Sequence, residues 1–133
     1  EKAIDGDINT ICGTGLLSSA GDQWLSVGIP DNSNVGYVAL YNRDDADWLA
    51  RMLNPFDIWL TRLPGTVPVN APSSDGHMCG QGLTVPVPDL GPFMIWCGRT
   101  TTNNLPYVTV ILRAASSPPI RLLSIGEMYV YQA

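Results

Sequence analysis

The sequence of 133 residues has few charged side chains, a single histidine and no long apolar run. Charged residues make up 14% of the chain and the net charge is −5, so the sequence lacks the basic surface that nucleic acid requires. No stretch approaches the roughly 20 apolar residues of a membrane-spanning helix. No basic cluster favours an anionic membrane surface. We therefore expect neither nucleic acid binding nor membrane insertion.

Catalytic and metal-binding motifs are equally scarce. The only histidine, His77, lies in a Gly/Ser/Pro-rich segment and is predicted to be a solvated surface residue. The sequence contains no C-x-x-C zinc motif, no G-x-S-x-G elbow and no phosphate-binding glycine loop. A carboxylate pair for glycoside hydrolysis stays open, because acids distant in sequence can meet in space. Nothing points to such a pair, and we predict that the protein is not an enzyme.

Glycine and proline, in contrast, are frequent, with 13 and 11 residues, and they separate short apolar runs along the whole chain. Several of these runs alternate with a period of two and are rich in β-branched and aromatic residues, which is typical of strands. Only residues 45–53 have the pattern of a helical turn or two. Closely spaced short strands in a chain of this length predict one antiparallel β-sandwich domain over 1–133. The expected strands are 24–29, 36–40, 56–61, 83–87, 93–97, 107–112, 122–125 and 127–131.

Three cysteines are present. Cys79 and Cys97 bracket a short Pro/Gly-rich segment, and we predict a disulfide between them. This bond would stabilise the fold by about 3 kcal/mol, mainly by restricting the unfolded chain. The alternative is a pair of buried thiols in a cytosolic protein. Cys12 is then left over, as a free thiol or as the partner of a cysteine outside this chain.

The amino-terminal segment AIDGDINT places Asp5, Asp7 and Asn9 at alternate positions, as in the first half of an EF-hand loop. Thr10 and Leu16 occupy the positions where that loop needs glycine and glutamate, so the segment is not an EF-hand. Two interpretations stay open from these residues. One is a calcium-binding turn, and the other is an ordinary turn held by its own Asx side chains.

The loop at residues 43–51 carries the most chemistry in the chain. Arg43 and Arg51 offer planar forks of donors that suit vicinal hydroxyls or a carboxylate, and Asp45 supplies matching acceptors. Trp48 could present a flat apolar face to a sugar ring. The alternative is an internal salt-bridge cluster that ties the loop down, with Trp48 half buried.

Four segments of the sequence resemble the discoidin-like superfamily, which includes the coagulation-factor C-type domains and the fucose-binding F-type lectins. They are AIDGDINT, QWLSVGIPDN, VGYVALYNRDDADWLARMLNPFDIWL and LLSIGEMYVY. The motif YNRDD followed by an arginine most resembles the F-type lectin branch. The resemblance implies an antiparallel jelly-roll β-sandwich of about eight strands. The family's usual first strand precedes the AIDG segment, so we expect this chain to be a fragment of a larger extracellular or cell-surface protein.

The resemblance also implies a calcium site and a disulfide. The family's calcium ligands correspond to Asp5, to the backbone around Lys2 and Asp7, and to Glu127. Because these residues come from both ends of the chain, calcium would hold the two ends together. The family's disulfide corresponds to the cysteine pair predicted above.

The fucose site of F-type lectins uses two arginines, an aspartate that orients them, and a histidine. The resemblance assigns Arg43, Asp45 and Arg51 to the first three roles, while Thr14 occupies the position of the histidine. This departure bears on fucose specificity and not on the fold.

We therefore predict an extracellular carbohydrate-binding module in which Trp48 or Trp24 packs on the sugar ring and for which the resemblance implies a stabilising calcium ion. The alternative is a structural or adhesive domain that binds neighbouring protein chains and has lost its sugar site. Thr14 and the unpaired Cys12 motivate this alternative.

Overall fold

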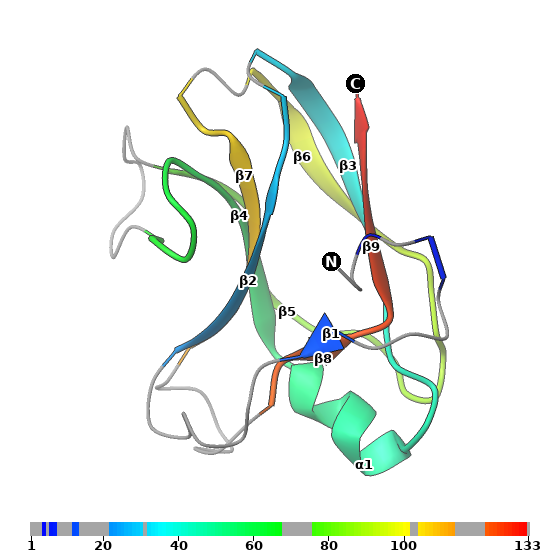
Figure 1. Cartoon of the computed structure of the whole chain (residues 1–133). Coiled ribbons are helices and arrows are strands. Elements are labelled where there is room, and N and C mark those ends of the chain that lie inside the picture. The colour runs from blue at the N-terminus through cyan, green and yellow to red at the C-terminus, as the bar shows by residue number, and fades with distance from the viewer. Residues whose placement is uncertain are drawn as a thin grey trace.

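The computed structural model describes residues 4, 6–7, 12–13, 22–30, 32–67, 76–101, 104–113 and 122–132 (Figure 1). Within these ranges the chain forms nine strands and two short helical segments. They are, in chain order, β1 (Cys12–Gly13), β2 (Gln23–Gly28), β3 (Asn34–Tyr41), α1 (Asp47–Ala50), the 3-10 turn η3 (Arg51–Leu53), β4 (Phe56–Thr61), β5 (Gly76–Leu83), β6 (Phe93–Thr101), β7 (Tyr107–Leu112), β8 (Ser124–Ile125) and β9 (Glu127–Gln132).

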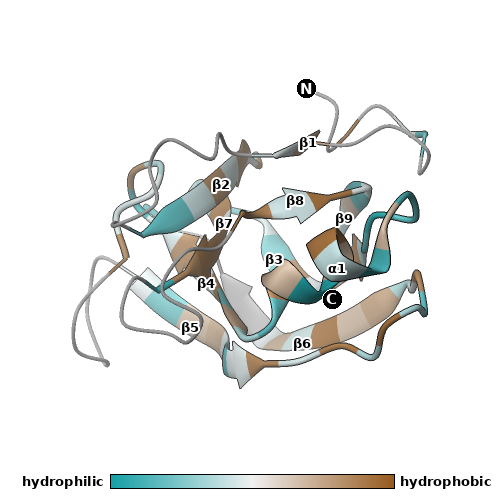
Figure 2. Ribbon diagram, turned by 90° about the horizontal axis from the view of Figure 1, so that it is seen from below, coloured by the Kyte–Doolittle hydropathy of each residue, from teal (hydrophilic) through white to brown (hydrophobic). Residues whose placement is uncertain are grey.

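The strands form two main antiparallel sheets that face each other. One sheet has the order β2-β7-β4-β5 and the other has the order β6-β3-β9. The short strands β1 and β8 pair with each other, and together with α1 they lie over the lower end of the sandwich (Figure 1; Figure 2). The predicted antiparallel β-sandwich is confirmed.

Alternation within single strands explains the layers. In β3, Val38 and Leu40 are fully buried in the core, while Tyr37 on the same strand is exposed. Successive side chains of a strand point to opposite faces, so a period-two sequence buries one face. The strand predictions around β2, β3, β4, β6, β7, β8 and β9 agree with the structure to within a few residues.

On the outer face of the β2-β7-β4-β5 sheet, the loop after β4 contacts the sheet through a series of hydroxyl groups. Thr61 and Thr109 are fully buried there, and their hydroxyls lie 2.9 Å apart. Thr109 Oγ1 lies 2.6 Å from Ser26 Oγ, which in turn accepts a hydrogen bond of 3.0 Å from the backbone N of Gly65. This chain of hydroxyls fastens the loop after β4 onto the sheet.

One strand prediction is wrong. The segment 83–87 is not a strand beyond Leu83, where β5 ends, because Pro86 and Pro88 remove ladder donors from it. The Asn54 side chain binds this segment instead, donating 2.8 Å to the Val85 carbonyl and accepting 2.9 Å from the Val85 amide. The strand β5 lies earlier, in the glycine-rich sequence GHMCGQGL, where apolar alternation is absent.

The prediction for His77 changes with this strand. His77 is half-buried in β5 and not in a solvated loop, and its Nε2 lies 3.0 Å from the carbonyl oxygen of Cys97. The ring therefore bridges the edge strands of the two sheets.

The disulfide prediction is confirmed. Cys79 of β5 and Cys97 of β6 are bonded, with their Cα atoms 4.4 Å apart. Because β5 and β6 are edge strands of different sheets, the bond closes one side of the sandwich. Cys12 is a free, half-buried thiol.

The helical turn expected at residues 45–53 is confirmed by α1 and η3. Ala50 and Leu53 of this turn are buried, as are Leu123 and Ile125 beside it, so the turn plugs the end of the core. None of the helices in the described ranges has the length and apolarity needed to cross a membrane.

Candidate functional site

The loop between β3 and β4 is closed at its neck by Asn42. The side-chain amide of this buried residue donates to the Ala50 carbonyl at 3.1 Å, and its Oδ1 accepts from the Arg43 backbone N–H at 2.8 Å. The backbone N–H of Asn42 donates to the Leu90 carbonyl at 2.9 Å. Arg43 follows Asn42 and Arg51 follows Ala50, so both arginines leave the same hydrogen-bonded neck. The fold thus brings together two residues that lie eight positions apart.

The Arg43 guanidinium is held in a fixed orientation. Its Nε donates 2.6 Å to Asp45 Oδ1 and its Nη2 donates 2.5 Å to Asp45 Oδ2, while Nη1 donates 3.0 Å to Ser124 Oγ. Only 9% of the Arg43 side chain is exposed, against 45% for Asp45. These contacts use three of the five N–H donors of the group, so two are left for a ligand.

The electrostatics of this pair follow from its geometry. The bidentate hydrogen bond from Arg43 lowers the pKa of Asp45 below its ordinary value of 3.8. Asp45 is therefore ionised at neutral pH, and a carboxylate in this state holds the guanidinium fork in one plane.

Ser124 connects the arginine to the far end of the sequence. It lies on β8, where it pairs with Gly13 of β1. Thr14, which holds the position that the resemblance assigned to a histidine, lies outside the described residues.

The two candidate stacking residues differ in their surroundings. Trp48 lies on α1 in the same loop as Arg43 and is 66% exposed. Trp24 lies on β2 and lines a cavity of about 100 Å³ with the free Cys12 and Leu25 among others. One face of the Trp24 ring is covered by Gly65, since a Cβ atom added there would lie 2.3 Å from Trp24 Cε2. Trp48 is the freer surface of the two.

Sequence reasoning missed Asn42 and Ser124. Asn42 had a weak signal, because it is a polar residue directly at the end of an apolar strand and before the arginine motif. Ser124 had none, because only the pairing of β8 with β1 and the packing of the loop bring its hydroxyl to Arg43.

The two ends of the chain meet at Glu127. This residue is 0% exposed at the start of β9, and its Oε2 accepts a hydrogen bond of 3.1 Å from the Gly6 amide. Asp7 lies exposed beside Gly6, while Asp5 and Lys2 fall outside the described residues. No group of three or more acidic, histidine or cysteine side chains converges within the ranges described. The buried carboxylate of Glu127 is one oxygen ligand of the kind that a hard cation takes.

No protein-family model and no curated protein matches the sequence. Solved structures do match. The lectin domain of lectinolysin, complexed with Lewis b antigen, has a TM-score of 0.67 and 20% identity, and the match covers 99% of this chain and 82% of that one. A Streptococcus pneumoniae fucose binding module has a TM-score of 0.65 and 22% identity, covering 99% and 81%. The F5/8 type C domain of a Bacteroides fragilis protein has a TM-score of 0.63 and 15% identity, covering 98% and 78%.

The chain has the discoidin-like fold. All three neighbours match over nearly the whole chain, so the likeness concerns the architecture and not one motif. The resemblance inferred from the sequence is confirmed at the level of the fold. Within this discoidin-like sandwich, the roles of Arg43, Asp45, Arg51, Trp48 and Thr14 stay predictions.

Proposed function

We propose that this protein is a carbohydrate-binding module without catalytic activity, acting outside the cell or at its surface. Structural neighbours of the chain are described as a lectin domain bound to Lewis b and a fucose binding module, which supports a glycan ligand. The disulfide supports an oxidising compartment. The observation that carries the proposal is the immobilised guanidinium of Arg43.

The proposed binding uses the N–H donors of Arg43 that do not bond to Asp45 or Ser124. Its two uncommitted N–H groups donate to neighbouring hydroxyls of one sugar, and Asp45 accepts from the same hydroxyls through its exposed side. Arg51, exposed at the other side of the loop neck, adds a second fork. The ring of Trp48 covers the apolar face of the sugar. Since Asp45 and Ser124 already fix Arg43, little side-chain entropy is lost on binding.

Substitutions of Arg43 test the proposal. In titrations with fucose and Lewis b, Arg43→Ala and Arg43→Lys should each weaken binding at least tenfold, because charge-assisted hydrogen bonds contribute about 1.5–3 kcal/mol. Lysine keeps the charge and loses the planar fork, so it separates geometry from charge. Arg62→Ala is the matched control, since Arg62 lies in the exposed loop after β4.

Two binding results would contradict the proposal. If a glycan array finds no sugar that the wild-type protein binds, or if binding is unchanged in Arg43→Ala, the site is not a lectin site. Circular dichroism of each variant confirms that the sandwich is folded.

We also propose that calcium binds where the ends of the chain meet, with Glu127 and Asp5 as side-chain ligands and with Asp7 and the backbone around Lys2 beside them. The buried Glu127 carboxylate and its contact with Gly6 support this proposal. A ligand at 100 times its dissociation constant stabilises the native state by about 2.7 kcal/mol. A chelator should therefore lower the melting temperature by about 10 °C. In Glu127→Gln the chelator should no longer change the melting temperature. Asp89→Asn, which alters an exposed carboxylate, is the control and should respond to the chelator as the wild type does. If the chelator does not change the melting temperature of the wild type, the calcium site is contradicted.

A further inference from the structure

The outer face of the β6-β3-β9 sheet carries a row of exposed aromatic rings. Trp96 of β6, Tyr37 of β3 and Tyr131 of β9 are 47%, 40% and 49% exposed. Tyr37 pairs with Trp96 on one side and with Tyr131 on the other, so the three residues lie in one line across the three strands. The ring centroids of Tyr37 and Trp96 are 4.8 Å apart.

The exposed rings of this face are neighbours, whereas on the outer face of the opposite sheet the exposed Trp24 (43%) and Met78 (38%) lie apart, on its two edge strands β2 and β5. On the outer face of the opposite sheet, Trp59 is only 3% exposed, and Thr61 and Thr109 are fully buried. Large apolar side chains that stay exposed together on a folded domain commonly mark an interaction site. The row Trp96–Tyr37–Tyr131 is a candidate for such a site.

A second row extends the patch toward the middle of the sheet. Met94 and Tyr129 flank the small, buried Ala39, each paired with it in register. The rings of Tyr129 and Tyr131 are 6.4 Å apart and inclined by 34°, so they run side by side along β9. The described side chains of the two rows are all uncharged.

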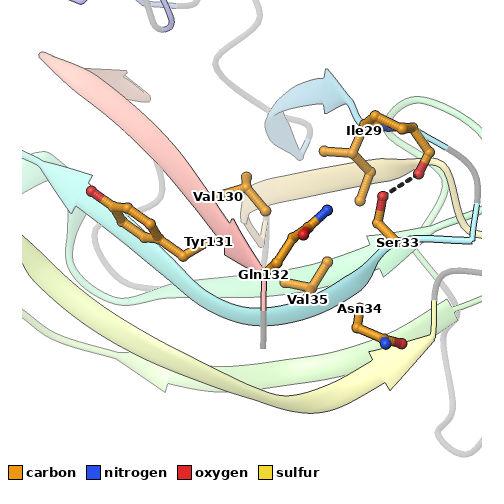
Figure 3. Close-up of a pocket in the computed structure, with 8 residues that line it drawn as sticks. Ile29, Ser33, Asn34, Val35, Val130, Tyr131 and Gln132 are labelled. Carbon is orange, nitrogen blue, oxygen red and sulfur yellow. Dashed lines mark hydrogen bonds between the residues drawn. The ribbon is translucent and has the colours of Figure 1, made fainter.

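A small cavity of about 90 Å³ lies at the end of the sandwich, on the core-facing side of β3 and β9, where Val35 and Val130 line it. Ser33 and Gln132 also line it, whereas the ring of Tyr131 points away from it (Figure 3). Ser33 donates its hydroxyl proton to the Pro30 carbonyl, at 2.6 Å. The cavity is therefore separate from the aromatic row.

We propose that this face binds a neutral, extended oligosaccharide, whose sugar units pack against the exposed rings of Trp96, Tyr37 and Tyr131. The planes of Tyr37 and Trp96 are inclined by 56°, so successive units meet rings at different angles. Phenol and indole groups combine an apolar face with a polar edge, which matches the C–H face and the hydroxyl rim of a pyranose. Neighbouring strands lie about 4.8 Å apart, close to the length of one sugar unit in an extended chain. A patch without charge on a chain of net charge −5 favours a neutral glycan over an acidic one.

The site is separate from the arginine loop. Arg43 lies two residues beyond the end of β3, whereas Tyr37 and the cavity lie toward the start of that strand. Six residues of extended chain separate Tyr37 from Arg43, a distance of about 20 Å. The inference does not depend on sugar binding at Arg43, and either site can fail alone.

Titration calorimetry of the full chain with cellohexaose, xylohexaose and mannohexaose tests the proposal. We expect at least one hexasaccharide to bind, and Trp96→Ala and Tyr37→Ala each to weaken it by about tenfold. Trp96→Phe should restore part of the affinity. Leu63→Ala is the matched control, because it removes an exposed apolar side chain from a different surface. Arg43→Ala should leave this affinity unchanged.

Three outcomes overturn the proposal. No binding of any of the three hexasaccharides is the first, and equal affinity of Trp96→Ala and the wild type is the second. The third comes from analytical ultracentrifugation of the same proteins. If the wild type self-associates, Trp96→Ala abolishes the association and no hexasaccharide binds, the face is an interface between copies of this chain.

Discussion

Alanine at Gly65 should destabilise the protein through the ring of Trp24. Gly65 has a φ of +68°, and a Cβ atom there would lie 2.3–2.7 Å from three atoms of that ring. Gly82 is the matched control, since its φ of +62° is nearly the same and nothing lies within 4 Å of its Cβ position. The difference between Gly65→Ala and Gly82→Ala therefore measures the contact with Trp24 and not the backbone conformation.

The magnitudes can be estimated from these contacts. An alanine in the left-handed region costs about 1 kcal/mol in either variant. Gly65→Ala also displaces the ring, which exposes an additional apolar area of about 50 Å² and costs roughly 1.3 kcal/mol. The hydrogen bond from the Gly65 amide to Ser26 contributes about 1 kcal/mol more. We expect losses of about 3 kcal/mol for Gly65→Ala and about 1 kcal/mol for Gly82→Ala.

Urea unfolding and thermal melting check these values. With about 0.28 kcal/mol/K of unfolding entropy for 133 residues, the two losses correspond to about 11 °C and about 4 °C. In a Trp24→Ala background, Gly65→Ala should cost no more than Gly82→Ala. Equal losses for the two glycine variants in the wild-type background would refute the reasoning, because the ring would then not rest on Gly65. Trp24 would in that case be as free as Trp48 to meet a sugar.

Further predictions concern three other contacts. Replacing both disulfide cysteines by alanine should lower the free energy of unfolding by about 3 kcal/mol in urea titrations, and a loss below 1 kcal/mol would contradict the loop-closure argument. By carbon-13 NMR, Asp45 should titrate below pH 3.8, and Arg43→Ala should return the midpoint toward that value. The lowered pKa means that the Arg43 contact stabilises the fold above pH 3.8 and is lost as the pH falls through the pKa of the folded state. Thr109→Val should cost about 1–2 kcal/mol by breaking the hydroxyl contacts with Ser26 and Thr61, while Thr109→Ser should keep both contacts and cost less.

The sequence predicted the strands whose two faces differ. In β3 and β7 the alternation of residue types is local, and a period of two is sufficient to assign a strand and its buried face. The disulfide between Cys79 and Cys97 and the helical turn before β4 were predicted for the same reason, since both depend on residues that punctuate the chain locally.

Pairing between distant segments was not predictable in this way. The glycine-rich β5 has no apolar period and is a strand only because β4 and the disulfide hold it. For the same reason the sequence placed His77 in a loop. The β4 strand has an alternating sequence but is buried on both faces, and on its outer face Arg113 lies over the Trp59 ring and pairs with Asp57. Contacts made across the sandwich leave no trace in a local pattern.

For the candidate sites, too, the local residue types were predictable from the sequence and the contacts between distant segments were not. The sequence by itself determined the residue types of the arginine loop, its two forks, its aspartate and its tryptophan, because they lie within nine consecutive positions. Only the tertiary structure decided that Ser124 supports Arg43, that Asn42 closes the loop neck, and that three aromatic rings from three strands form one row. The physical reason is register: which side chains meet across neighbouring strands is fixed by the alignment of segments far apart in the chain.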